Sequence, residues 1–138
     1  MTDDAAPAVA GRRPEVIVDF DVRDGLLFVS LENIGDGSAY DVTTRFEPPF
    51  RGLDGQKDIA GMNVFRRAEF MPPGKAFVQL VDPLAVYVSR QEPMRLSAAI
   101  SYRDRQGCQY TDVINHDLRV YLDLGDMTVR RRAPSSEP

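Results

Sequence analysis

The feature that most constrains the fold of this sequence is a hairpin signal near its amino terminus. Two runs of alternating apolar and polar residues, 16–23 and 26–33, are separated only by Asp24-Gly25. Asp-Gly is a preferred pair for a two-residue type I′ turn, because glycine accepts a positive φ angle at little cost. A turn of two residues fixes the register, so that Phe20 faces Val29 and the apolar sets of the two runs face each other. The pattern predicts an antiparallel hairpin with one buried face.

Further runs with the two-residue period of a strand follow along the chain, and turn signals separate them. The strand candidates after the hairpin are 40–46, 63–70, 76–81, 94–103, 108–115 and 118–124, with 84–88 as a further strand or as a loop across the sheet edge. No segment sustains the 3.6-residue period of a helix. Seven or eight short strands with alternating patterns predict an all-β domain, built as an antiparallel β-sandwich or barrel.

The hairpin formed by the strand candidates at 94–103 and 108–115 leaves its register open. A four-residue loop turns Thr111 and Val113 toward the core. A three-residue loop with a bulge turns Tyr110 inward instead, together with Ile114 and Asp112. A slip of one residue reverses the face of every side chain, so that the pattern alone does not choose between the two.

The length of 138 residues predicts one domain with a substantial core. Residues 14–125 hold all the strand signals and form the predicted sandwich. Residues 1–13 are rich in Ala and Pro and are expected to be a flexible, disordered lead-in. Residues 126–138 include three consecutive arginines and are expected to be a flexible basic tail.

Charge and hydropathy exclude several classes of partner. The formal net charge is −4, and an acidic domain is poorly suited to neutralising phosphates, so we expect no nucleic-acid binding. No stretch approaches the ~20 apolar residues that cross a bilayer, and the amino terminus lacks the basic and apolar regions of a secretory signal. We therefore expect no membrane insertion and a cytoplasmic location, with a virion as the alternative setting.

Residues that could carry chemistry are sparse. Cys108 and His116 are the only cysteine and histidine, and they stand at opposite ends of one predicted strand, too far apart to act as a nucleophile and its base. The run from Asp19 to Gly25 resembles a calcium loop, but Arg23 and Ser30 occupy positions where that loop needs ligands. We therefore expect no catalytic residue, no metal site, no cofactor and no enzymatic activity.

The long loop at 47–61 is the least ordinary segment, because loops of this length without regular structure are often functional. Aromatic and arginine side chains are favoured at protein interfaces. The alternative is that Phe50 and Leu53 fold back and cap one end of the sandwich. On these grounds the tentative partner-binding residues are Phe50, Arg51, Leu53, Arg66 and Arg67.

Two stretches resemble a pattern of bacterial immunoglobulin-like domains of the adhesion-module type. The first is the run from Leu27 to Gly35 followed by Ala39-Tyr40-Asp41-Val42, and the second is the turn region from Ile100 to Gly107. The resemblance spans about residues 15–124 and implies an immunoglobulin-like sandwich. The chain has no Trp and a single Cys, so the disulfide-linked core of an antibody domain is excluded.

Sandwiches of this kind serve many roles, so that the fold alone does not assign one. Our leading hypothesis is a non-enzymatic interaction or assembly module, whose loops or edge strands bind another protein or a second copy of the chain. The alternatives are a virion or cell-surface decoration domain and a domain that binds a small molecule or a carbohydrate.

Overall fold

The fold is described from a computed structural model, which describes residues 12–124 and 127–130. Most of the predicted flexible lead-in and basic tail lies outside these residues. The elements in chain order are β2 (Val16–Arg23), β3 (Leu26–Asn33), β4 (Ala39–Glu47), α2 (Asn63–Arg66), β5 (Ala68–Met71), β6 (Ala76–Pro83), α3 (Leu84–Ser89), β7 (Arg95–Arg103), β8 (Gln109–Asp117) and the 3-10 helix η1 (Leu118–Asp123).

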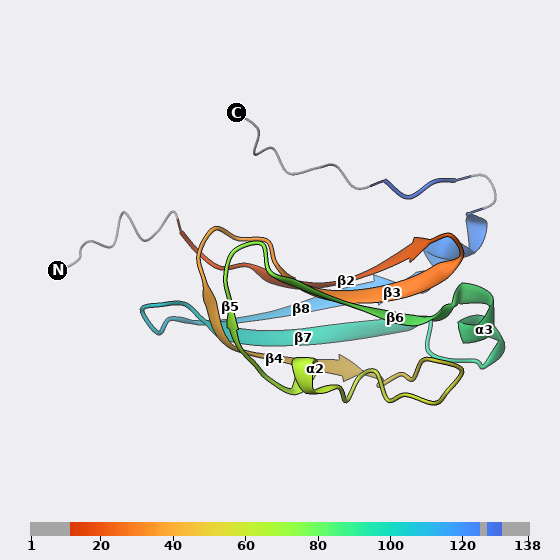
Figure 1. Cartoon of the computed structure of the whole chain (residues 1–138), viewed down its shortest axis with the longest axis horizontal. Coiled ribbons are helices and arrows are strands. Elements are labelled where there is room, and N and C mark those ends of the chain that lie inside the picture. Colours follow the sequence, from red (N-terminus) through yellow and green to blue (C-terminus); the bar gives the residue numbers. More distant parts are fainter. Residues whose placement is uncertain (1–11, 125–126, 131–138) are drawn as a thin grey trace.

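The strands form two antiparallel sheets, which confirms the all-β prediction. One sheet has the order β2-β3-β6 and the other has the order β5-β4-β7-β8. Figure 1 shows the two sheets as layers, with α3 and η1 at the end where the β2–β3 turn lies. Among the described residues, every helix is too short or too polar to cross a lipid bilayer.

The β2–β3 hairpin has the predicted register, with Phe20 opposite Val29. Asp24 and Gly25 both have positive φ angles, 52° and 77°, as a type I′ turn requires. The inward residues of both strands are buried, and they contribute much of a core that extends to β4, β7 and the loop after β4.

The β7–β8 hairpin adopts the second of the two predicted arrangements. Tyr102 pairs with Tyr110, and the Asp104 N–H donates to the Cys108 carbonyl at 3.0 Å, which closes a three-residue loop. Tyr110 and Ile114 therefore face the other sheet. Asp112 lies on the same face yet is exposed, because β8 is the edge strand of its sheet.

Three predicted strands are wrong in whole or in part. Residues 118–123 form η1, because the Asp117 carboxylate accepts the Arg119 N–H and caps the turn. The predicted strand at 63–70 divides into α2 and β5. Residues 84–89 form α3, neither a strand nor a loop, and its inward residue Tyr87 is buried in the core.

A buried asparagine, Asn33, joins three segments at one end of the sandwich. Its Oδ1 accepts the N–H groups of Glu15, at 3.1 Å, and Gly35, at 3.0 Å. Its Nδ2 donates to the carbonyls of Gly37 and Met71, each at 2.9 Å. The side chain is 0% exposed and uses its donors and acceptors fully. Gly35 is required here, because a Cβ would overlap the backbone of the segment that enters β2.

The free edge of β2 is closed by side chains from the opposite sheet and from η1. His116 Nε2 contacts the Val18 carbonyl at 3.0 Å, and the Tyr121 hydroxyl donates to the Phe20 carbonyl at 2.6 Å. The Tyr102 hydroxyl hydrogen-bonds the backbone of Val16. We call Tyr102, His116 and Tyr121 the β2 clamp.

The Asn33→Ala variant should be strongly destabilised. It leaves buried backbone groups without partners, and we expect the free energy of unfolding to fall by about 3 kcal/mol. Asn115→Ala removes an exposed side chain of β8 and should change it by less than ~0.5 kcal/mol. Urea unfolding of both variants provides the measurement, and equal effects would contradict the role of Asn33.

His116 should make stability depend on pH. Burial lowers the pKa of His116 below its ordinary 6.5, so that below this pH the unfolded chain binds a proton more readily than the folded chain does. The free energy of unfolding should therefore decrease as the pH falls through about 6.5. His116→Gln retains an N–H donor and does not titrate, so it should lack this component in urea unfolding between pH ~5.5 and ~8. Parallel pH profiles for the two proteins would contradict the prediction.

Candidate interaction surface

The long loop after β4 folds back onto the core instead of presenting its aromatic residue. Phe50 is 1% exposed and packs in an aromatic cluster, with ring centroids 5.7 Å from Phe20 and 5.1 Å from Phe46. Phe50 therefore has no surface for a partner, and its position agrees with the alternative that it caps the sandwich. Leu53 remains partly exposed.

A charged network anchors the same loop to β6 and α3. The Arg90 guanidinium forms ion pairs with Asp82 and Glu92 and donates to the Arg51 carbonyl at 3.1 Å. The Asp82 carboxylate accepts the Asp54 N–H at 2.8 Å, and Glu92 accepts the Arg51 N–H at 3.0 Å. These bonds fix the loop backbone, so that the Arg51 side chain lies on an ordered part of the surface.

The other two predicted residues, Arg66 and Arg67, lie at the carboxyl end of α2. Arg66 and Arg67 are both exposed, but α2 ends at Arg66 and Arg67 already has an extended backbone. The Arg67 side chain consequently reaches the outer face of the four-stranded sheet, where it contacts Asp41 of β4. The structure thus places Arg67 beside Asp41 on the surface, whereas Phe50 lies in the aromatic cluster of the core.

That cluster depends on a bulge in β4. Tyr40 pairs with Arg103 but Thr43 pairs with Ser101, so β4 has one extra residue opposite β7. Asp41 lies in the bulge with a φ of 54°, a conformation that costs a non-glycine residue about 1 kcal/mol. The bulge directs the Asp41 carboxylate outward, between two arginines.

Arg103 from the end of β7 and Arg67 from the residue before β5 hold the Asp41 carboxylate between them. Arg103 Nε donates to Asp41 Oδ2 at 3.1 Å, and Nη2 of the same guanidinium contacts the same oxygen. Arg67 Nη2 donates to Asp41 Oδ1. These hydrogen bonds, the one from Arg103 first, lower the pKa of Asp41 below its ordinary 3.8. Each guanidinium keeps further N–H groups that can bind a ligand.

An aromatic pair lies beside these arginines. The rings of Tyr40 and Phe70 are 5.3 Å apart on paired positions of β4 and β5. Phe70 is 50% exposed, which is unusual for a large aromatic side chain. We call Tyr40, Asp41, Arg67, Phe70 and Arg103 the aromatic–arginine patch.

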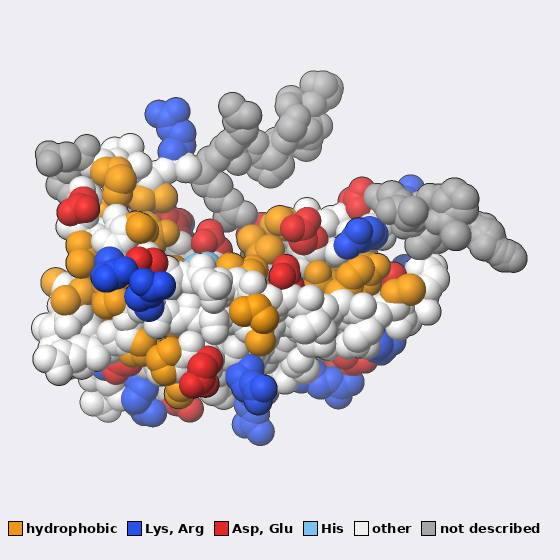
Figure 2. All heavy atoms as spheres, turned by 180° about the vertical axis from the view of Figure 1, so that it is seen from behind, with side chains coloured by type: hydrophobic (Ala, Val, Ile, Leu, Met, Phe, Trp, Pro, Cys, Tyr) orange, Lys and Arg blue, Asp and Glu red, His pale blue; other side chains and the backbone are white. Residues whose placement is uncertain are grey.

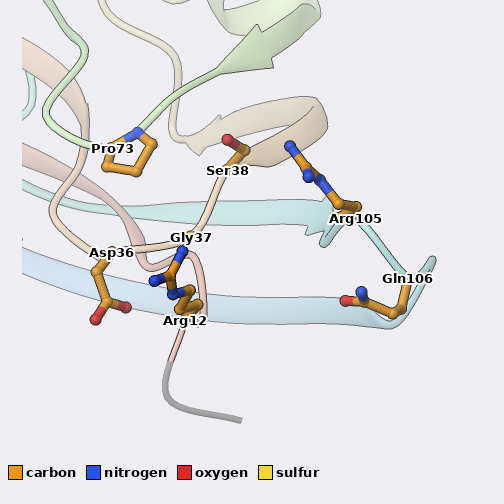
Figure 3. A pocket seen from close by; sticks show the side chains of 7 residues that line it. All are labelled: Arg12, Asp36, Gly37, Ser38, Pro73, Arg105 and Gln106. Carbon is orange, nitrogen blue, oxygen red and sulfur yellow. The ribbon is translucent and has the colours of Figure 1, made fainter. Parts of the chain in front are cut away.

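A cavity of about 490 Å³ opens at the ends of the same strands. Figure 3 shows the side chains that line it, which come from the entry to β2, the turn before β4, the turn after β5 and the β7–β8 loop. The lining residues are Arg12, Asp36, Gly37, Ser38, Pro73, Arg105 and Gln106. Ser38 precedes β4 and Arg105 follows β7, so that the cavity adjoins the patch and adds two guanidinium groups.

A second, apolar hollow lies at the opposite end of the sandwich, between α3 and η1. Its lining includes Leu84, Val88, Tyr121 and Leu122, and Figure 2 shows hydrophobic side chains gathered at this end of the molecule. Within the residues that the structure describes, no three His, Cys, Asp or Glu side chains come together as metal ligands.

Sequence reasoning identified Arg67 and missed Tyr40, Phe70 and Arg103. One signal for the bulge was present. The β4 sequence has an apolar residue at Ala39 and the next inward apolar residue at Val42, a spacing of three where a regular strand has two. That break in alternation marks the bulge, but it does not show which strands lie beside it.

The fold and this surface define the chain as an all-β, two-sheet domain with an exposed aromatic–arginine patch. A family model described as "Domain of unknown function (DUF8453)" matches residues 5–122. The chain belongs to this family. A comparison with curated proteins found no match. Among solved structures, the X-ray structure of the Northeast Structural Genomics Consortium target SoR45 is similar at 11% identity and a TM-score of 0.32, over 88% of this chain and 94% of that one.

Phe50 and Leu53 should behave differently when truncated. Phe50→Ala removes a buried ring and should lower the free energy of unfolding by about 3 kcal/mol. Leu53→Ala, at a partly exposed position of the same loop, should lower it by less than ~1 kcal/mol. Thermal and urea unfolding of the two variants would test this, and a stable Phe50→Ala protein would show that the loop does not depend on its aromatic anchor.

Proposed function

We propose that this domain is a non-enzymatic protein-interaction module, and that the aromatic–arginine patch binds an acidic segment of another protein. The observation that carries the proposal is the exposed Phe70 ring beside Arg67 and Arg103, which Asp41 orients. Aromatic and arginine side chains dominate the binding energy of protein interfaces. Arginines that are already oriented lose less side-chain entropy on binding.

Charge supports an acidic partner. Arg12 and Arg105 line the adjoining cavity together with a single carboxylate, Asp36, and Arg45 is exposed on β4. No hydrogen bond or ion pair to a carboxylate is found for these three side chains among the described residues. Guanidinium groups bind carboxylates through paired hydrogen bonds, so that a segment with carboxylates and an apolar residue complements this surface.

The order of the strands supports an immunoglobulin-like sandwich as the frame of this module. After the β2–β3 hairpin the chain crosses to the second sheet for β4 and β5, returns for β6, and crosses again for β7 and β8. Crossings of this kind between two antiparallel sheets are typical of Greek-key sandwiches. Such frames present binding residues on faces, loops and edges of a rigid scaffold.

The proposal can be tested with a phage-displayed random peptide library. Peptides selected by the wild-type domain should be enriched in Asp or Glu next to an apolar residue. Phe70→Ala should weaken the binding of a selected synthetic peptide by at least about tenfold, and Arg67→Ala should weaken it and reduce its salt dependence. Titration calorimetry at two salt concentrations provides the measurement.

Val113→Ala is the matched control, because Val113 is an exposed apolar residue of β8 outside the patch. Its peptide affinity should equal that of the wild type. Selected peptides without acidic residues, or an affinity that Phe70→Ala leaves unchanged, would refute the proposal.

A further inference from the structure

The two outer edges of the β2-β3-β6 sheet differ in how their backbone groups are satisfied. On β2, the clamp residues Tyr102, His116 and Tyr121 occupy backbone groups at alternate positions of the free edge. An added strand would have to displace these side chains. The β2 edge is therefore closed to pairing with another chain.

On β6, the ladder with β3 determines which residues point outward. The Asn33 N–H donates to the Lys75 carbonyl at 3.0 Å. Further along the ladder, Phe77 pairs with Leu31 and Gln79 pairs with Val29. Because alternate residues of an antiparallel strand bond to the same neighbour, the N–H and C=O groups of Ala76 and Val78 point away from the sheet.

The second half of this β6 edge is already covered. Gln79 Nε2 donates to the Leu80 carbonyl at 2.8 Å. The Leu53 N–H, from the loop after β4, donates to the Val81 carbonyl at 2.6 Å. For the outward groups of Ala76 and Val78, the described part of the chain provides no partner. The open stretch is short and apolar, and Val78 is 57% exposed.

We propose that a second copy of this chain covers the stretch, and that β6 of the two copies pairs antiparallel around a two-fold axis at Phe77. Ala76 of each copy then lies opposite Val78 of the other, and each of these pairs exchanges two N–H···O bonds. An isologous contact of this kind joins the two three-stranded sheets into one. This dimer is independent of the aromatic–arginine patch.

The free groups and the charges select this register and this occupant. Centring the axis on Val78 would pair Ala76 with Leu80, whose carbonyl Gln79 already occupies. Around Phe77, the two Phe77 side chains lie opposite each other, where aromatic cross-strand pairs are favourable. Lys75 lies opposite Gln79 of the other copy, so that no like charges are paired in the ladder. The edge is thus complementary to itself.

Sedimentation equilibrium of the full chain over a wide concentration range tests the proposal. The wild type should show a reversible monomer–dimer equilibrium. Val78→Pro removes the outward N–H and leaves the β3 ladder intact, so it should weaken dimerisation by at least about tenfold, which corresponds to about 1.4 kcal/mol. Val78→Thr, the matched control, keeps that N–H and should dimerise like the wild type.

Amide exchange measured by NMR provides a second test that does not depend on a variant. The amides of Ala76 and Val78 should become protected as the protein concentration rises, whereas those of Phe77 and Gln79 should be protected at every concentration. A protein that stays monomeric up to about 1 mM, or a dimer that Val78→Pro leaves unchanged, would overturn the proposal. Either result would leave the peptide-binding test of the patch unaffected.

Discussion

The buried Asn33 side chain donates two hydrogen bonds and accepts two, and these four bonds hold together the end of the sandwich on which the candidate surface is built. They connect the chain entering β2, the turn before β4 and the last residue of β5. Without them, these backbone groups would be buried and unpaired, which costs far more than an average hydrogen bond contributes. The position of the β4 start, and hence of the bulge two residues later, depends on this one amide.

The β2 clamp and the loop after β4 provide hydrogen-bond partners for backbone groups at the sheet edges. A two-sheet sandwich leaves outer strands with unpaired backbone groups, which invite other chains to pair. Here side chains from β7, β8 and η1 close one edge, and a loop backbone covers half of another. Within the β2-β3-β6 sheet, the part of an edge that stays open is the short stretch of β6 at Ala76 and Val78. Because side chains and a loop occupy the other parts of this sheet's edges, the uncovered part of β6 is where another chain can pair.

How much of the site could be predicted depends on how local its determinants are. Arg67 could be named from the sequence because arginines are exposed in most folds. Arg103 could not, since its partner Asp41 lies 62 residues away and the bulge that joins them is a property of two paired strands. At Phe50 the structure differs from the expectation. An aromatic residue beside prolines in a long loop suggested an interface, but its ring is buried in the core.

The sequence by itself determined the β2–β3 hairpin and its register, because a two-residue Asp-Gly turn and the alternating pattern act on neighbouring residues and agree. It also determined the all-β class, through the same two-residue period in later segments. Only the tertiary structure decided the register of β7–β8, the helical turns of α3 and η1, and the cluster around Asp41. Distant contacts contribute to α3, η1 and the Asp41 cluster, because Tyr87 is buried in the core, Tyr121 bonds Phe20 and Arg103 bonds Asp41. Such contacts overrule the weak local preference of a short apolar run.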